Sequence, residues 1–393
     1  MRGVKNLTNL KIRGSVGTSG NQNFVNNGSG SYYSYITEKY YDNQIGVLLK
    51  SMANPNLQWE KSLDYNIGMD MNYGRLMFNI DLYRRVTKDL VADIDIVPST
   101  GFNTVKDNLG EILNKGIEAK ISYTILRTNN SFVNINGAIA FNDNRITKIS
   151  EQMRQFNDRQ NSLASDPRYN KPVLRYIDGM PMNAIWAVRS MGIDPSTGNE
   201  IYLDRNGVPT YTWSASDMVM AGVSTPKFNG ILGVTGESKG IGFNVVLRFL
   251  GGGQIYNQTL VDRVENIDPI YNVDKRVLSG RWKYEGQQAL FKRLGTAYLP
   301  EDAMQSALGY TTGYVKAATQ STTRFVQDRN ELTLSSISVY YEFNEKILKK
   351  TGLARLRIGA FMNDAHTFSS VGIERGIYYP FARTLSLNLI GTF

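Results

Sequence analysis

Between Leu63 and Tyr73 the sequence reads LDYNIGMDMNY, an unbroken alternation of apolar residues with polar residues or glycine over eleven positions. Alternation with a period of two is the pattern of a β-strand with one apolar face. A strand of a soluble protein is usually about five or six residues long, whereas a tilted strand that crosses a bilayer needs about nine to eleven. The length of this alternation therefore predicts a membrane-crossing strand.

The same alternation recurs along the chain. After the turn at Gly74-Arg75, a second alternating stretch begins at Leu76, which predicts a long hairpin. Further strands are expected at 10–16, 117–123, 133–141, 228–234, 243–249, 332–343, 353–361 and 385–393. A pair at Ala184–Met191 and Asn199–Leu203, turning at Asp194–Gly198, would raise the number of strands from ten to twelve.

The connections between these strands alternate in length. Short ones fall at 74–75, 125–131, 237–240 and 344–352, and long polar ones at 17–60, 88–114, 144–184 and 251–330. Outer-membrane barrels have short periplasmic turns and long extracellular loops. If Phe393 lies at the periplasmic end, then Tyr73, Tyr123 and Phe343 end strands there too, as an aromatic girdle requires. The sequence predicts an all-β fold: a transmembrane antiparallel β-barrel of ten to twelve strands, or part of a larger one.

Composition excludes several other classes of protein. The 36 Gly, 23 Tyr and 16 Phe favour strands and turns, and no stretch has the roughly 18 consecutive apolar residues of a membrane helix. The net charge of +9 is spread over interspersed basic and acidic residues, which favours outer-membrane lipid head groups over nucleic acid as a partner. With no cysteine and His366 alone, which we expect in a loop, no metal site or cofactor is predicted. Asp93 and Asp95 show no matched acid and base, so no catalytic residue and no enzyme is predicted.

Several residues have both a functional and a structural interpretation. The tryptophans could stack on sugar rings, but packing in loops is the favoured interpretation of Trp59, Trp186, Trp213 and Trp282. The turn at 194–198 lacks the spacing of a calcium loop, and Gly251–Gly253 is expected to let the chain leave a strand. Charges facing the lumen could set selectivity, although pairing among themselves is favoured. These charges are Lys11, Arg13, Asp70, Asp81, Glu118, Lys120, Arg248, Arg355 and Arg357. Substrate-binding residues remain unknown at this point.

A series of short motifs resembles SusC/RagA-type TonB-dependent transporters. The motifs occur in the order of that family and span nearly the whole chain. They are Lys11–Gly17 with Gly20-Asn21-Gln22, Asn54–Lys61, Ser99–Phe102, Asn114–Glu118, Gly192–Gly198, Ser224–Pro226, Gly253–Asn257 and Arg281-Trp282.

The resemblance implies a function. Residues 1–393 would be the carboxy-terminal portion of a larger barrel, of 22 strands, with the signal peptide, the plug and the TonB-contacting segment absent. The whole protein would import large nutrients, oligosaccharides or peptides, across the bacterial outer membrane. It would be energised through TonB, contacted by the missing amino-terminal region, and would work with a SusD-like surface lipoprotein. Two alternatives remain open: a self-contained passive outer-membrane channel, and a barrel remnant that transports nothing.

Overall fold

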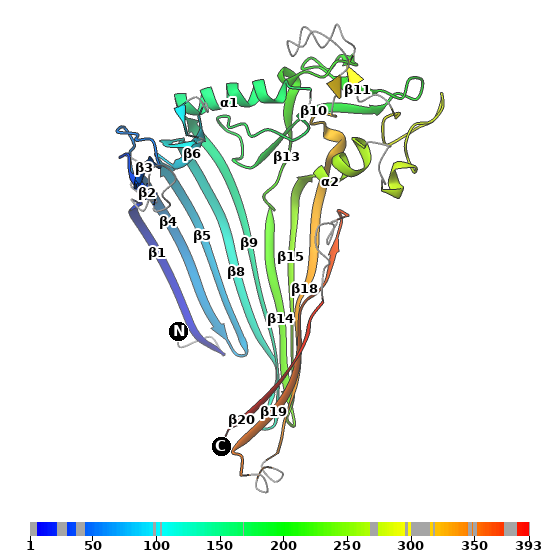
Figure 1. The fold of residues 1–393 in the computed structure, drawn as a ribbon. Helices are drawn as coiled ribbons and strands as arrows, with labels where there is room; N and C mark the ends of the chain where they lie inside the picture. Colours follow the sequence, from blue (N-terminus) through cyan, green and yellow to red (C-terminus); the bar gives the residue numbers. More distant parts are fainter. Residues whose placement is uncertain are drawn as a thin grey trace.

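One long antiparallel sheet dominates the computed structural model (Figure 1). The structure describes residues 6–21, 30–36, 44–96, 100–102, 104–167, 169–267, 274–294, 298–299, 315–316, 319–344, 348, 352–372 and 383–392. In spatial order the ten strands of this sheet are β1 (Leu7–Asn21), β4 (Glu60–Tyr73), β5 (Leu76–Lys88), β8 (Gly110–Thr128), β9 (Ser131–Ile149), β14 (Phe228–Ser238), β15 (Ile241–Tyr256), β18 (Val326–Glu342), β19 (Arg355–Ser369) and β20 (Leu385–Thr392).

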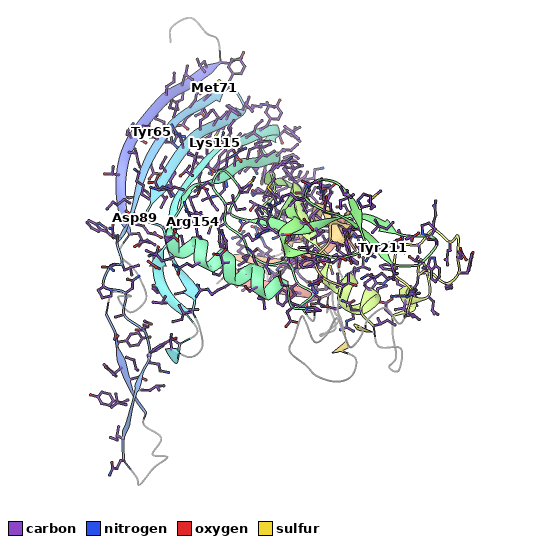
Figure 2. The ribbon with its side chains drawn as sticks, turned by 90° about the horizontal axis from the view of Figure 1, so that it is seen from above. Tyr65, Met71, Asp89, Lys115, Arg154 and Tyr211 are labelled. Atoms are coloured by element: carbon purple, nitrogen blue, oxygen red, sulfur yellow. The ribbon has the colours of Figure 1, made fainter. Side chains whose placement is uncertain are left out.

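The sheet is a curved wall with two free edges. Each strand between β1 and β20 pairs antiparallel with both of its neighbours, so backbone N–H and C=O groups along the paired lengths have partners on each side. Viewed end-on, the wall strands β1, β4, β5, β8 and β9 follow an arc (Figure 2). Because β1 and β20 lie at opposite ends of the strand order, the ten described strands do not close on themselves. They form an open segment of barrel wall.

The pairing register gives the wall one apolar face. Ile67, Leu82, Ile117 and Phe141 lie opposite one another on β4, β5, β8 and β9. All four side chains are exposed, Ile67 by 62%. Residues one position away, such as Asn66, point to the opposite face, which is polar. An exposed, continuous apolar face on strands of this length is the lipid-facing side of a membrane barrel.

Aromatic side chains mark one rim of the apolar face. Tyr73 and Tyr123 lie on either side of Leu76 in the register, and both are exposed. Near the end of β18, Phe343 packs edge-on against Tyr341, with ring centroids 5.0 Å apart. This agrees with the predicted girdle of aromatic residues at the end of the wall that carries the short turns. The predicted role of Phe393 lies outside the described residues.

The strands are longer than the sequence pattern indicated. β8 and β9 each contain 19 residues, and β15 and β18 run well into segments expected to be loops. At Gly251–Gly253 the chain does not leave the strand, which corrects the sequence-based expectation. Instead β15 continues with a shift in register between Leu250 and Gly253, and Gly252 has a φ of +74°. A bulge adds a residue and bends a strand without ending it.

The long connections fold into a cap at the other end of the wall (Figure 1). A separate four-stranded sheet at the centre of the cap has the order β12-β11-β10-β13. The elements of the cap are α1 (Glu151–Ala164), β10 (Ala184–Ile193), β11 (Glu200–Leu203), β12 (Pro209–Thr210), η2 (Ala215–Asp217), β13 (Met218–Val223), α2 (Gln258–Leu260), the π-helical turn η3 (Val261–Glu265), η4 (Lys275–Val277) and η5 (Thr323–Phe325).

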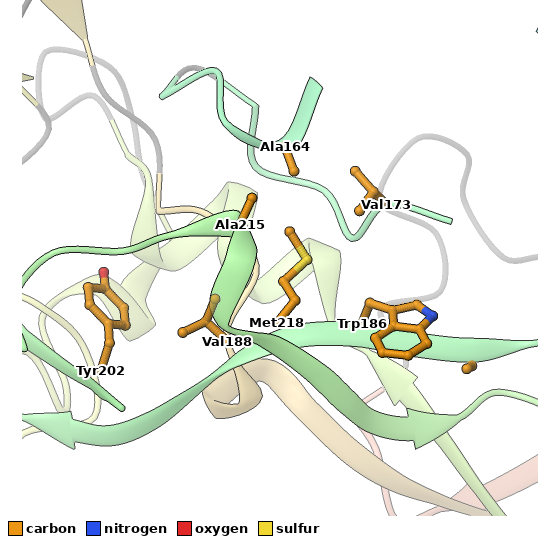
Figure 3. Packing of buried hydrophobic residues seen from close by; sticks show 8 residues of the cluster. Ala164, Val173, Trp186, Val188, Tyr202, Ala215 and Met218 are labelled. Atoms are coloured by element: carbon orange, nitrogen blue, oxygen red, sulfur yellow. The ribbon is translucent and has the colours of Figure 1, made fainter. Parts of the chain in front are cut away.

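The expected pair of additional barrel strands was wrong. β10 and β11 do form a hairpin, but it belongs to the cap and not to the wall. Trp186 and Val188 of β10 lie in one buried cluster with Tyr202 and Met218 (Figure 3). Ile185, on the other face of β10, lies in a second buried cluster. A strand that protein covers on both faces has no face for lipid, and the alternation pattern alone did not reveal this.

The remaining described elements are three short hairpins. They are β2 (Tyr33–Ile36) with β3 (Gly46–Leu49), β6 (Val91–Asp95) with β7 (Thr104–Asn108), and β16 (Tyr298–Leu299) with β17 (Val315–Lys316). The first extends away from the sheet (Figure 2). The helices of the described part of the chain all fall short of the length and apolarity needed to span a membrane.

We expect arginine to be tolerated on one face of the wall only. Ile80 lies on the lipid-facing side of β5, midway between Leu76 and Arg84. Ile80→Arg places a charge near the middle of the bilayer, at a cost of about 2–4 kcal/mol. Asn79→Arg places the same charge on the polar face beside Asp70. The amount of assembled protein in outer membranes should fall for the first variant only, and an equal fall for both would contradict the assignment of faces.

Candidate functional site

The polar face of the wall carries a paired charge cluster at its β1 side. Arg13 on β1 contacts Asp70 at 3.2 Å and Asp81 at 2.8 Å, and Asn79 also donates to Asp70. Arg13 lies across Gly68, where an added Cβ would be 2.7 Å from the guanidinium carbon. Gly68 therefore leaves the space that lets one arginine bridge carboxylates on two strands.

Next to this cluster is an open hollow of about 800 Å³ on the lumen side. Tyr83 donates to the Asn142 side chain at 3.0 Å, and Arg85 pairs with Asp64. The polar side chains that line the hollow are Arg13, Asp64, Asn66, Asp81, Tyr83, Arg85, Asn114, Glu118 and Asn142. Amides, carboxylates and guanidinium groups can exchange hydrogen bonds with a hydroxyl-rich or peptide solute that passes along the wall.

Six of the nine lumen charges singled out in the sequence have ion-pair partners. Besides the Arg13 cluster, Arg248 lies 3.8 Å from Asp364, and Arg355 and Arg357 both contact Glu342. Within the described part of the chain, Lys11, Glu118 and Lys120 have no ion-pair partner. The sequence did not indicate that Tyr83, Asn114 and Asn142 line one hollow, although Asn114 begins a family motif, because nothing in a linear pattern brings β5, β8 and β9 together.

The cap has a buried ionic centre. Arg324 of η5 contacts Glu200 of β11 at 2.9 Å and Glu265 of η3 at 2.6 Å. The Glu200 and Glu265 side chains are 0% and 1% exposed, and Lys292 lies 4.0 Å from Glu200. Arg281, also buried, donates to the backbone carbonyls of Val277 and Val264 in the same region. Segments far apart in the sequence are thus joined through one charged network.

The pKa values in the cap follow from these contacts. Burial alone would raise the pKa of Glu200, but the charges of Arg324 and Lys292 outweigh it and lower the pKa below its usual range. Burial would likewise lower the pKa of Arg324, yet its two carboxylate partners raise it. Hydrogen bonds from Tyr211, Ser196 and Thr197 lower the pKa of Asp194. Glu200, Arg324 and Asp194 are therefore charged at neutral pH.

The sequence motifs of the cap contact one another. The turn at 194–198 is a structural turn, with Asp194 accepting hydrogen bonds from the hydroxyls of Ser196 and Thr197. The Trp282 indole donates to the Pro195 carbonyl at 2.8 Å and lies against Gly198, where a Cβ would be 2.6 Å from the ring. Gly198 has a φ of +74°, which favours glycine as well. The motifs at 192–198 and 281–282 therefore form a single packed unit.

A second pair of motifs attaches the cap to the wall. The backbone N–H of Val223, just before Ser224–Pro226, donates to the Gln254 side chain at 2.9 Å. Gln254 itself donates to Asp328 of β18, and the position of a Cβ on Gly253 would be 3.1 Å from the Pro226 nitrogen. These contacts place β13 beside the upper part of β15.

The tryptophans are mostly structural. Trp186 is buried and donates to the Arg175 carbonyl, Trp213 donates to the Ser321 carbonyl, and Trp282 is part of the unit described above. Trp59 is 48% exposed. His366 lies within β19 and packs edge-on against Phe368, so the expectation of a loop residue was wrong. The described residues include no cluster of three or more groups suited to holding a metal ion.

Taken together, a long-stranded wall with one lipid-facing and one polar face, short turns at one end and a folded cap at the other, defines an outer-membrane β-barrel protein. Residues 5–361 match the family model described as "TonB dependent receptor-like, beta-barrel". The chain belongs to this family, whose members are outer-membrane transport proteins and not enzymes.

Known proteins similar to the chain are considerably longer. It is 21% identical to TonB-dependent receptor P39 of Formosa agariphila, over 94% of the chain and 37% of that receptor. TonB-dependent receptor SusC of Bacteroides thetaiotaomicron is 30% identical over 38% of the chain and 16% of SusC. A solved structure of the RagAB peptide transporter has a TM-score of 0.69 at 20% identity, covering 94% of the chain and 38% of that one. The last similarity shows a shared fold.

We expect the cap to depend on Arg324. Arg324→Gln leaves Glu200 and Glu265 buried without their main partner, a change that typically costs about 3–5 kcal/mol. Limited proteolysis should then cleave the cap faster. Arg154→Gln, which removes an exposed arginine of α1, is the control and should change little. Equal cleavage of the two variants would contradict the role of Arg324.

The same network makes the stability of the cap depend on pH. Because folding lowers the pKa of Glu200, the stabilisation that it contributes is present above the ordinary glutamate pKa and is lost as pH falls below it.

Proposed function

We propose that this chain forms the carboxy-terminal barrel wall and extracellular cap of an active outer-membrane importer. The cargo is a large nutrient, an oligosaccharide or a peptide, and the energy comes through TonB. A SusD-like surface lipoprotein works with it at the extracellular end. The proposal rests on membership of the family and on the names of two relatives, SusC and the RagAB peptide transporter.

Among the structural features, the folded cap supports this proposal most. Its ionic centre and the contacts between its motifs join the long connections into one packed platform instead of separate loops. A packed platform above a polar wall suits a protein that must present a surface to a partner and pass a bulky solute beneath it. The polar hollow of about 800 Å³ on the lumen side provides hydrogen-bonding groups along that route.

One loop of the cap provides a surface for the lipoprotein. Leu278, Tyr284 and Leu290 lie between η4 and residue 294, and each is at least 66% exposed. The backbone N–H of Leu290 donates to the Gly280 carbonyl at 2.7 Å, which closes this loop. Exposed apolar side chains on an ordered loop mark a protein interaction surface. We assign this surface to the partner lipoprotein.

Dependence on TonB tests the transport proposal. Uptake of labelled oligosaccharides and peptides is measured in cells that make the protein, with and without a functional TonB. An active importer loses uptake of its cargo when TonB is inactivated, because the energy input is removed. A passive channel keeps the same initial rate in both cells, and that result would overturn the proposal.

Co-purification tests the partner surface. We expect Leu278→Ser combined with Leu290→Ser to reduce the amount of surface lipoprotein that co-purifies from detergent extracts, since two exposed apolar contacts are removed. Leu174→Ser, at another exposed leucine of the cap, is the matched control and should leave the complex intact. Unchanged co-purification of the double variant would sink the assignment of this surface.

A further inference from the structure

The lipid-facing side of the wall has a hollow close to the cap end. This outer hollow, about 660 Å³ in volume, lies over β4, β5, β8 and β9. Its floor consists of Ile67, Leu82, Ile117 and Phe141, the exposed apolar row described above. Such a floor suits the hydrocarbon chains of a lipid.

The side of the outer hollow nearest the cap is basic. Arg84 and Lys115 are register partners on β5 and β8, one step beyond Leu82 and Ile117 on the same face. Lys227, just before β14, also lines the hollow. Lys115 lies 3.5 Å from Asp143, but Asp143 is shared with Arg145 at 3.2 Å. Among the described residues no carboxylate pairs with Arg84 or Lys227, so the hollow has an excess of positive charge.

The height of these cations on the wall matches the membrane boundary. On β5, Arg84 follows Leu76 by eight residues, and Leu76 lies in the aromatic girdle between Tyr73 and Tyr123. Eight residues span about 26 Å along a strand, or about 20 Å along the membrane normal at a tilt of about 40°. The apolar band of such barrels is about 25 Å tall. The guanidinium group of Arg84, with its long side chain, therefore reaches the head-group layer while Leu82 stays in the hydrocarbon.

The cations beside the outer hollow form a group on neighbouring strands. A second hollow of about 550 Å³ adjoins the first through Tyr65 and Arg84, and Trp59, Lys61 and Lys88 line it. On β18 and β19, the exposed side chains near the cap end of the same face are Leu332, His366 and Phe368, and Arg383 is exposed just before β20. A single cation such as Arg383 suits a general interfacial anchor, whereas three cations that line one hollow, Arg84, Lys115 and Lys227, indicate a site for a particular head group.

We propose that the outer hollow binds an anionic, phosphate-bearing lipid of the outer leaflet. Its acyl chains lie over Ile67, Leu82, Ile117 and Phe141, and its phosphate lies between Arg84, Lys115 and Lys227. Arginine offers the phosphate two parallel N–H donors, and lysine adds a compact charge. This inference goes beyond import, because it concerns the outer surface of the wall and not the lumen.

Native mass spectrometry of the protein extracted from outer membranes tests the site. The probes are phosphatidylglycerol, phosphatidylcholine with the same acyl chains, and inorganic phosphate. We expect phosphatidylglycerol to bind more tightly than phosphatidylcholine. Arg84→Gln combined with Lys115→Gln should weaken phosphatidylglycerol binding about 25-fold, at about fivefold for each cation. Binding of phosphatidylcholine should stay the same.

A double variant on the opposite face is the matched control. Arg85→Gln with Lys120→Gln removes two cations from the same strands but from the lumen side. It should leave lipid binding unchanged. An equal loss in both double variants, or equal affinity for the two lipids, would overturn the proposal, as would inorganic phosphate binding as tightly as the lipid. If the first double variant fails to assemble, Lys227→Gln, outside the strands, should still lower binding about fivefold.

Discussion

The need to satisfy every backbone polar group without water constrains the whole structure. In lipid, an unpaired N–H or C=O costs several kcal/mol, so a strand can cross only as part of a continuous ladder. The eight inner strands meet this need by pairing with a neighbour on each side, and only β1 and β20 lie at the edges of the wall. Strand length follows from the thickness of the bilayer, and alternation follows from the difference between lipid and lumen.

The two faces of the wall need different side chains, because one contacts lipid and the other lines the lumen. The lipid face needs only apolar side chains in the right band, and it tolerates cations where that band ends, as at Arg84 and Lys115. The lumen face must carry polar groups without leaving charges unpaired, and it does so through cross-strand bridges such as Arg13 with Asp70 and Asp81. Gly68 leaves room for this bridge, since a Cβ at that position would be 2.7 Å from the guanidinium carbon and the Arg13 side chain would have to shift.

The cap depends on contacts of another kind. It has a hydrophobic core around β10, but its segments are joined by buried charges and by tight approaches at glycine. Glu200, Glu265 and Arg324 come from three elements that lie up to 124 residues apart, and Gly198 packs under Trp282. The family motifs at 192–198 and 281–282, which are far apart in the sequence, therefore pack against each other. This packing is a physical reason for the two motifs to occur together.

The sequence by itself determined the strands of the wall, their lipid-facing residues and the asymmetry of their connections, because period-two alternation is local and the bilayer sets its length. It also indicated which lumen residues carry charge, though not which charges pair. Only the tertiary structure decided that β10 and β11 belong to the cap, because burial on both faces depends on what packs against them. The same holds for the lumen hollow, the Glu200–Arg324–Glu265 network and the outer hollow, each assembled from strands or loops whose adjacency comes from register and packing.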